Sequence, residues 1–167
     1  GYLRLAYASD SSASIAIGLT QARLQLDQQQ LEQALATLCH LRELAPKHEG
    51  VLEALCRLCV ELKDWASVVD LLHDVRKADW MGREALTTLE IQAYAGLLSD
   101  VVDEHALANV WCSMPKQVQR YPDIVFVYAQ KLMAFDQLSQ AEQVLRASLD
   151  DAWNNKLIML YAKLDSN

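Results

Sequence analysis

The chain has 167 residues, a formal net charge of −7, and only five glycines and three prolines. Its hydrophobic content of 52% is enough for a buried core and excludes a disordered chain. The acidic balance argues against a nucleic-acid surface, because binding to phosphates needs a basic field. The longest uninterrupted apolar run, residues 124–129, is far shorter than the roughly 20 residues that cross a bilayer.

The first segment, residues 1–10, reads as the end of a helix from a preceding unit. Ser9-Asp10-Ser11-Ser12 then predicts a polar linker. Because this segment lacks a helix start, we expect the chain to be a piece of a longer protein, from which an upstream anchor could have been removed.

The next two segments repeat one another. Residues 15–46 and 49–80 align without a gap at an offset of 34, which pairs Ala22 with Cys56 and Leu38 with Leu72. That offset is the tetratricopeptide period. Each segment shows an apolar helical periodicity, a short polar break and a second helical run, which predicts two antiparallel helices. We assign unit 1 to residues 13–46 and unit 2 to residues 49–80.

Small residues support this register, because the two helices of a unit cross closely. Ala22 and Ala34 stand at the expected eighth and twentieth places of unit 1, and Pro46 stands at its closing place. Gly18 is one of several residues that interrupt the apolar pattern of the first helix. Gln29 stands where a turn glycine is commoner.

The rest of the chain continues the array. Residues 83–119 predict a longer, degenerate helix pair, with helices at 83–99 and 103–119. Unit 3 covers residues 122–153, with Ala129 and Ala141 at the two small places. Residues 154–167 predict the first helix of a further unit. The predicted fold class is therefore all-α, a single tetratricopeptide-like domain in which antiparallel helix pairs form an α-α superhelix.

No catalytic or metal-binding set stands out, so we expect a chain that is not an enzyme. The Cys56-x-x-Cys59 spacing falls within a helix on the packing face, where core filling is the better interpretation than zinc. All the cysteines lie in apolar helical stretches and predict reduced, core-filling thiols in a cytoplasmic compartment: Cys39, Cys56, Cys59 and Cys112. We also expect tryptophans to wedge adjacent units together: Trp65, Trp111 and Trp153.

One face of the first helices predicts a partner-binding groove. The pairs Arg23-x-x-x-Asp27 and Arg57-x-x-x-Glu61 recur 34 residues apart and have the spacing of ion pairs along a helix. The groove places of a tetratricopeptide repeat also include these residues: Leu26, Glu53, Phe126, Gln130 and Met133. Two interpretations stay open, namely a solvated face, or a strip where arginines meet carboxylates of a peptide or porphyrin and the apolar residues hold its apolar part.

Several landmarks together resemble the HemY-type tetratricopeptide proteins of proteobacteria. They include Leu44-Ala45-Pro46-Lys47-His48, Tyr94-Ala95-Gly96-Leu97 and Val110-Trp111-Cys112-Ser113-Met114-Pro115. The resemblance implies a scaffold that recruits or regulates late haem-synthesis enzymes on the cytoplasmic side of the inner membrane. The membrane would be reached only through upstream helices absent from this chain.

Two alternatives remain beside the scaffold. One is a carrier or sensor of haem or porphyrin, with a histidine as a possible ligand. The other is a generic assembly module, such as one for envelope biogenesis. We expect no resident cofactor unless haem binds, and proteins rather than nucleic acids as partners.

Overall fold

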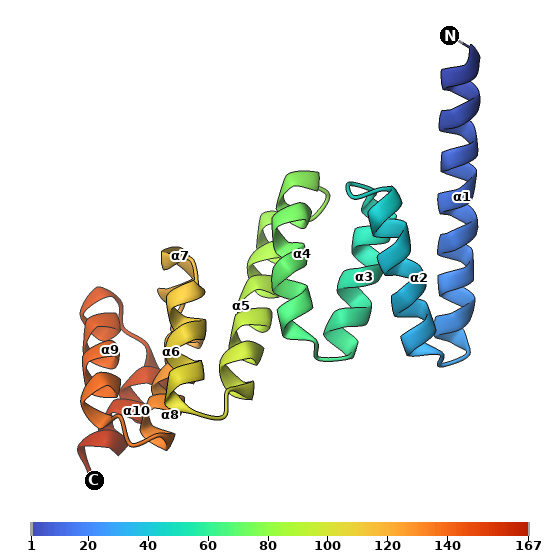
Figure 1. Ribbon diagram of the computed structural model, residues 1–167. Coiled ribbons are helices and arrows are strands. Elements are labelled where there is room, and N and C mark those ends of the chain that lie inside the picture. The colour runs from blue at the N-terminus through green and yellow to red at the C-terminus, as the bar shows by residue number, and fades with distance from the viewer. Residues whose placement is uncertain (1, 167) are drawn as a thin grey trace. The chain divides into compact units, whose positions relative to one another are not determined.

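The structure, a computed structural model, describes the backbone of residues 2–166 and the side chains of residues 10–166. Within that range it contains ten helices and no strand (Figure 1). The predicted all-α fold class is confirmed. The chain divides into two compact units, Gly1–Gly82 and Arg83–Asn167, and each is described by itself.

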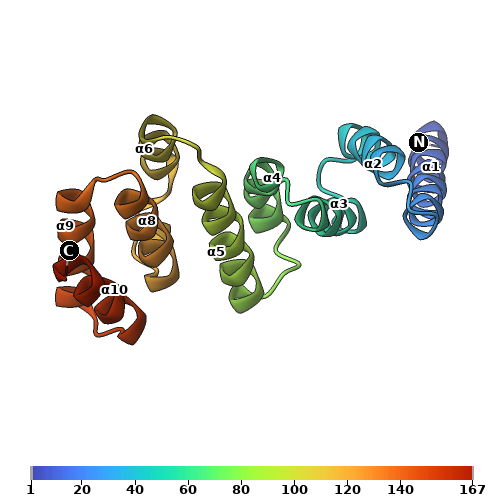
Figure 2. The same cartoon turned by 90° about the horizontal axis from the view of Figure 1, so that it is seen from below.

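The first compact unit consists of four helices, each packed on the next. They are α1 (Tyr2–Asp27), α2 (Leu31–Leu44), α3 (Glu49–Glu61) and α4 (Trp65–Ala78). Figures 1 and 2 show these helices side by side, with α1 extending well past α2. Apolar residues of α2, α3 and α4 are completely buried between them: Ala34, Leu38, Val51, Leu52 and Val68.

The polar linker predicted at residues 9–12 does not exist, because α1 is one continuous helix from Tyr2 to Asp27. Serine and aspartate each cost only a fraction of a kcal/mol in a helix interior, roughly 0.5 kcal/mol relative to alanine. The good helix formers on both sides outweigh that cost. The separate leftover helix expected at residues 1–10 is therefore the first part of α1.

Residues that interrupted the apolar pattern of α1 hold α2 in place. A Cβ atom added to Gly18 would lie 2.5 Å from Cδ2 of Leu41, a side chain that is only 4% exposed. Thr37 of α2 donates a hydrogen bond of 2.8 Å to Oε1 of Gln25. The missing side chain and the polar side chain thus both serve the α1–α2 contact.

The same turn ends the first helix of three hairpins. Gln29, Lys63 and Asp136 have φ angles of 60°, 55° and 60°. The residue after each one donates its backbone N–H to the carbonyl five places earlier, over 2.8, 2.9 and 2.7 Å. These positions are equivalent in the three assigned units. The positive φ angle explains why glycine is common there.

The second compact unit contains α5 (Arg83–Asp100), α6 (Glu104–Ser113), α7 (Lys116–Gln119), α8 (Pro122–Ala134), α9 (Leu138–Asp151) and α10 (Asn155–Asp165). Helix α5 packs on α6 and α8, and α10 packs on both α8 and α9. A core cluster joins α8, α9 and α10, and consists of Val125, Ala129, Leu145, Leu157 and Leu160.

The prediction of a single helix over residues 103–119 is wrong, because α6 ends at Ser113 and the short α7 begins at Lys116. Proline disfavours a helical conformation in the residue before it, and Met114, which precedes Pro115, has an extended ψ of 141°. The break leaves α7 as a separate turn at the end of α6.

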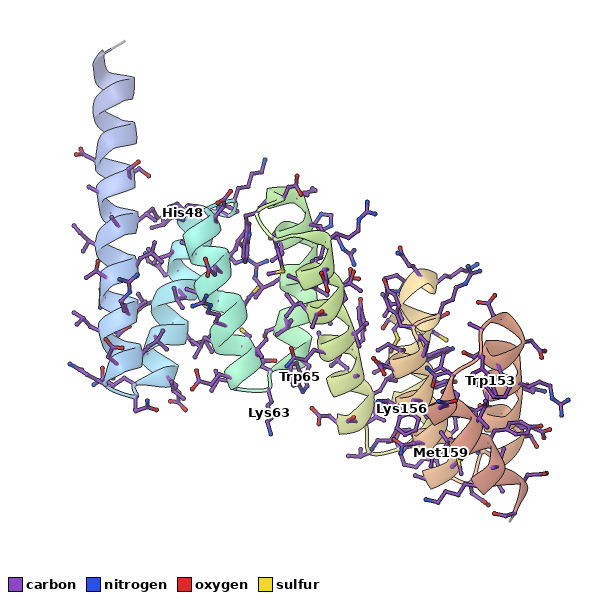
Figure 3. The ribbon with its side chains drawn as sticks, turned by 180° about the vertical axis from the view of Figure 1, so that it is seen from behind. His48, Lys63, Trp65, Trp153, Lys156 and Met159 are labelled. Atoms are coloured by element: carbon purple, nitrogen blue, oxygen red, sulfur yellow. The ribbon has the colours of Figure 1, made fainter. Side chains whose placement is uncertain are left out.

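Several predicted core residues lie at the surface. Trp153 (Figure 3) is 80% exposed, so it wedges no units together. Its indole N–H donates a hydrogen bond to Oδ1 of Asn155 at 3.0 Å. Trp111 is half-buried and stacks on Tyr128 with ring centroids 3.8 Å apart. Cys39 and Cys112 are exposed, against the prediction for both. Their helices are apolar on one side only, and the periodicity did not resolve which side each thiol takes.

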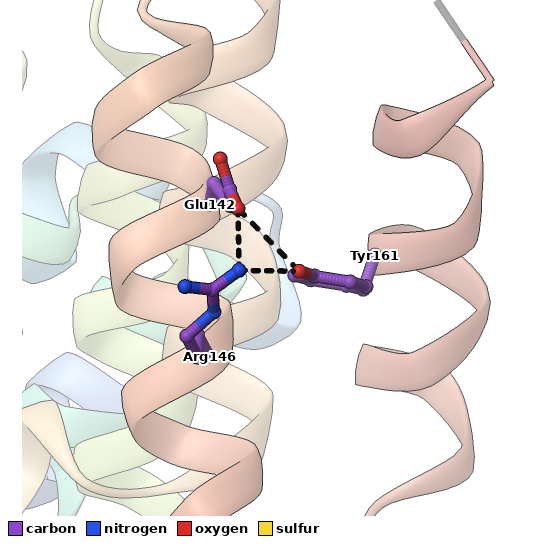
Figure 4. A network of polar contacts seen from close by, with 3 residues as sticks. All are labelled: Glu142, Arg146 and Tyr161. Carbon is purple, nitrogen blue, oxygen red and sulfur yellow. Dashed lines mark hydrogen bonds and ion pairs between the residues drawn. The ribbon is translucent and has the colours of Figure 1, made fainter.

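A polar network joins α9 to α10 at the surface (Figure 4). Arg146 donates to Oε1 of Glu142 at 2.8 Å and to the Tyr161 hydroxyl at 3.1 Å.

None of the described helices combines the length and the apolar character that crossing a bilayer requires.

Candidate partner-binding groove

A hollow of about 360 Å³ lies between α1 and α3 in the first compact unit. Five residues of the predicted groove line it together: Arg23, Leu26, Asp27, Glu53 and Arg57. They come from two helices that are separated in sequence by α2, so the repeat brings them together in space. We call this site the α1–α3 groove.

Small residues make room for this groove. Ala22, Gly50 and Ala54 line it together with Leu19. A Cβ atom on Gly50 would lie 3.3 Å from Cδ1 of Leu19, so glycine lets the leucine lie directly over α3. Sequence reasoning missed Gly50 and Ala54, although their small size next to the charged positions was a usable signal.

The ion pairing in the groove differs from the predicted pattern. Arg57 pairs with Glu53 at 2.8 Å instead of with Glu61, which is exposed and does not line the groove. Both glutamates are four residues from Arg57, but a helix favours the order with the acid on the N-terminal side of the base. Glu53 meets that condition and Glu61 does not.

The same rule applies to the other predicted pair. Arg23 precedes Asp27, which is the less favourable order, and no ion pair joins these two described residues. Arg23 therefore presents an exposed guanidinium with no ion-pair partner in the described part of the chain. The half-buried Leu26 lies on the same groove wall.

The groove presents a charged group beside apolar side chains. A free guanidinium can bind a carboxylate through two charge-assisted hydrogen bonds, and the adjacent leucines can contact an apolar group. The residues that line the groove include no His, Cys, Tyr or Met that could ligate haem iron. The nearby His48 caps α3, because its Nδ1 accepts a hydrogen bond from the backbone N–H of Val51 at 3.4 Å.

The other predicted groove residues lie in the second compact unit. Phe126 and Met133 pack against the α8–α9–α10 core cluster, because α10 covers that side of α8. They are partly buried packing residues and not free groove side chains. Gln130 is exposed on the same helix.

The paired cysteines behave as core residues. Cys56 is 5% exposed and Cys59 is 1% exposed, and burial raises the pKa of both thiols to about 11. Both are therefore uncharged near neutral pH, when a thiolate would be needed for metal binding or nucleophilic attack. Among the described residues, no cluster of three His, Cys, Asp or Glu side chains could hold a metal ion.

Comparison with curated proteins matches the chain to proteins named HemY. The chain is 24% identical over 157 residues to Protein HemY of Escherichia coli (strain K12). The chain resembles HemY. The matches to Protein HemY of Escherichia coli O157:H7 and of Shigella flexneri have the same identity and length. The resemblance predicted from the sequence is thus confirmed.

The HemY match covers 92% of this chain but 39% of the relative, so the chain spans about two-fifths of the length of the curated relatives. Because 157 aligned residues exceed the length of either compact unit, the resemblance includes parts of both. No protein-family model matches the chain. No solved structure matches it either.

Proposed function

We propose that the chain is a non-enzymatic protein-interaction module whose α1–α3 groove binds a carboxylate-bearing segment of a partner protein. The observation that carries this proposal is the Arg23 guanidinium, which has no ion-pair partner in the described chain and stands beside the half-buried Leu26. A partner's acidic side chain would pair with Arg23, and an adjacent apolar side chain would contact Leu19 and Leu26.

The resemblance to HemY supports a choice of partner. We propose, as the resemblance implies, that the chain recruits or regulates late haem-synthesis enzymes on the cytoplasmic side of the bacterial inner membrane. Anchoring would depend on upstream helices outside this chain. The array of helices would then serve as the platform on which these enzymes meet.

The groove predicts unequal roles for its two arginines. Arg57 already pairs with Glu53, so a partner gains less from it than from Arg23. We expect Arg23→Glu to weaken binding of a purified late haem-synthesis enzyme by roughly tenfold or more, because it replaces a charge-assisted hydrogen bond by repulsion. Arg57→Glu should weaken binding less. Biolayer interferometry with the immobilised chain measures both effects.

Lys77→Glu, an exposed charge reversal on α4 that does not line the groove, is the matched control and should bind as the wild type does. Unchanged binding by Arg23→Glu would overturn the groove assignment. If none of the haem-synthesis enzymes binds the wild type, the proposed partners are wrong. A saturable Soret shift on titration with hemin, lost on replacing one His, Cys or Tyr, would instead support the haem carrier.

A further inference from the structure

The second compact unit contains a larger hollow that the sequence patterns did not indicate. Its volume is about 550 Å³, and it is bordered by residues of α6, α7, α8 and α9 together with Arg120, which caps α7. We call it the α7 site. The residues used below are Trp111, Lys116, Arg120, Val125, Val144 and Asp151.

The short helix α7 is held firmly at this site. Val118 is 2% exposed and Met114 is 5% exposed, so both anchor the α6–α7 junction in the core. Gln119 donates its side-chain N–H to the backbone carbonyl of Trp111 at 2.7 Å, which links α7 back to α6. Lys116 of α7 and the capping Arg120 line the hollow.

Those side chains carry an unbalanced positive charge. Lys116 and Arg120 are four residues apart and both line the hollow, although like charges at this spacing destabilise a helix. Neither forms an ion pair within the part of the chain that the structure describes. Residues 105–122 contain no Asp or Glu, in a chain with 22 acidic and 15 basic residues. An anion between the two cations would relieve this repulsion.

The rest of the site narrows the class of anion. Val125 and Val144 give it apolar contact area, and the half-buried Trp111 ring, stacked on Tyr128 with an interplanar angle of 3°, gives it an aromatic wall. Asp151 lines the same hollow and would repel a densely charged polyanion, such as nucleic acid or a polyphosphate, more strongly than a segment with two separated carboxylates. Two carboxylates flanking an apolar side chain fit both features.

We infer that the α7 site binds an acidic peptide segment of a partner, with carboxylates on Lys116 and Arg120 and an apolar side chain between Trp111 and Val144. The site shares no residue with the α1–α3 groove and lies in the other compact unit. It therefore gives the chain a second docking point. Its failure would leave the Arg23 proposal untouched, and the converse also holds.

The probe is the capped peptide acetyl-Ala-Glu-Leu-Asp-Ala-amide, titrated into the full chain, with acetyl-Ala-Gln-Leu-Asn-Ala-amide as its uncharged match. NMR spectra of the tryptophan indole N–H groups report binding, because Trp111 lines the site and the exposed Trp153 does not. We expect saturable shifts of the Trp111 signal with the acidic peptide and none with the uncharged one.

Lys116→Glu combined with Arg120→Glu should weaken binding by roughly tenfold or more, since two charge-assisted contacts are lost. Lys156→Glu combined with Lys163→Glu changes the net charge equally at exposed positions of α10 that do not line the hollow, and should bind as the wild type does. Lys116→Gln combined with Arg120→Gln serves if the charge reversal disturbs folding.

Three results would overturn the inference. The first is the absence of a saturable Trp111 shift at millimolar peptide. The second is equal weakening in the two charge-reversed variants, which would mean attraction by overall charge only. The third is a larger Trp111 shift with inorganic phosphate than with the peptide, which would make the site a phosphate site.

Discussion

Gly18 controls the α1–α2 packing through the side chain that it lacks. Gly18→Ala should gain about 1 kcal/mol of helix propensity but bring a methyl group against the buried Leu41, and overpacking typically costs about 1–3 kcal/mol. We expect a net loss of about 1 kcal/mol in the free energy of unfolding, measured by urea titration with far-UV circular dichroism. Gly82→Ala should cause no loss of stability, because a Cβ atom added at Gly82 would have no contact within 4 Å. Equal stability of Gly18→Ala and wild type would mean that Leu41 simply rotates away.

The thiols test the burial assigned to each cysteine. Iodoacetamide should alkylate the exposed Cys39 and Cys112 readily in the native chain, and Cys56 and Cys59 only after addition of denaturant, as read by mass spectrometry. Burial raises the pKa of the latter two from 9.0 to about 11, so the neutral form is favoured on folding. Their stabilising contribution is complete below pH 9 and is lost as the pH rises through about 11. Native labelling of all four thiols at neutral pH would contradict this assignment.

At the scale of the helix, three strained turns offer a stabilising substitution. Gln29, Lys63 and Asp136 have positive φ angles, which cost a residue with a Cβ atom roughly 1 kcal/mol and cost glycine almost nothing. We therefore expect Gln29→Gly and Lys63→Gly each to raise the free energy of unfolding by up to about 1 kcal/mol. Gln21→Gly, at an exposed position inside α1, should lower it by about as much. Chemical denaturation of the three variants decides between these signs.

The elements also show what the sequence could and could not reveal. The repeat period predicted one helix pair over residues 49–80 and another over residues 122–153, where the structure has α3 with α4 and α8 with α9. It could do so because small residues and polar breaks recur wherever two helices must cross. The continuity of α1 was missed, since weakly unfavourable residues resemble a linker locally. Groove residues of unit 1 and unit 2 come together because α1 and α3 border one hollow. Two of the groove residues predicted in unit 3, Phe126 and Met133, are partly buried because they pack against the α8–α9–α10 core cluster.

The α7 site was out of reach of the sequence for a different reason. Its residues come from four helices and the capping Arg120, and Lys116 belongs to the degenerate pair while Val144 and Asp151 belong to unit 3, so no period connects them. The only local signal was the pair of like charges at Lys116 and Arg120. Such violations of local preference are worth attention when they occur without a compensating partner.

At the scale of the whole molecule, the two compact units should fold on their own. Each buries its own apolar residues, for example Leu38 and Leu52 in the first and Leu145 and Leu157 in the second. We expect fragments 1–82 and 83–167 each to give a helical spectrum with cooperative melting, and their summed far-UV spectra to match that of the whole chain. Stabilities of several kcal/mol are expected for domains of this size.

A fragment cut inside the first unit provides the control. Residues 1–48 keep the α1–α2 hairpin but lose α3, and with it the fully buried Val51 and Leu52. A single hairpin without that covering face should show little helicity and no cooperative transition. If fragment 1–82 or 83–167 is also unfolded while the whole chain melts cooperatively, the two units depend on one another for stability, and a partner bound at Arg23 could then affect binding at the α7 site. If both fragments fold, the two sites act independently, and each can be titrated in its own fragment.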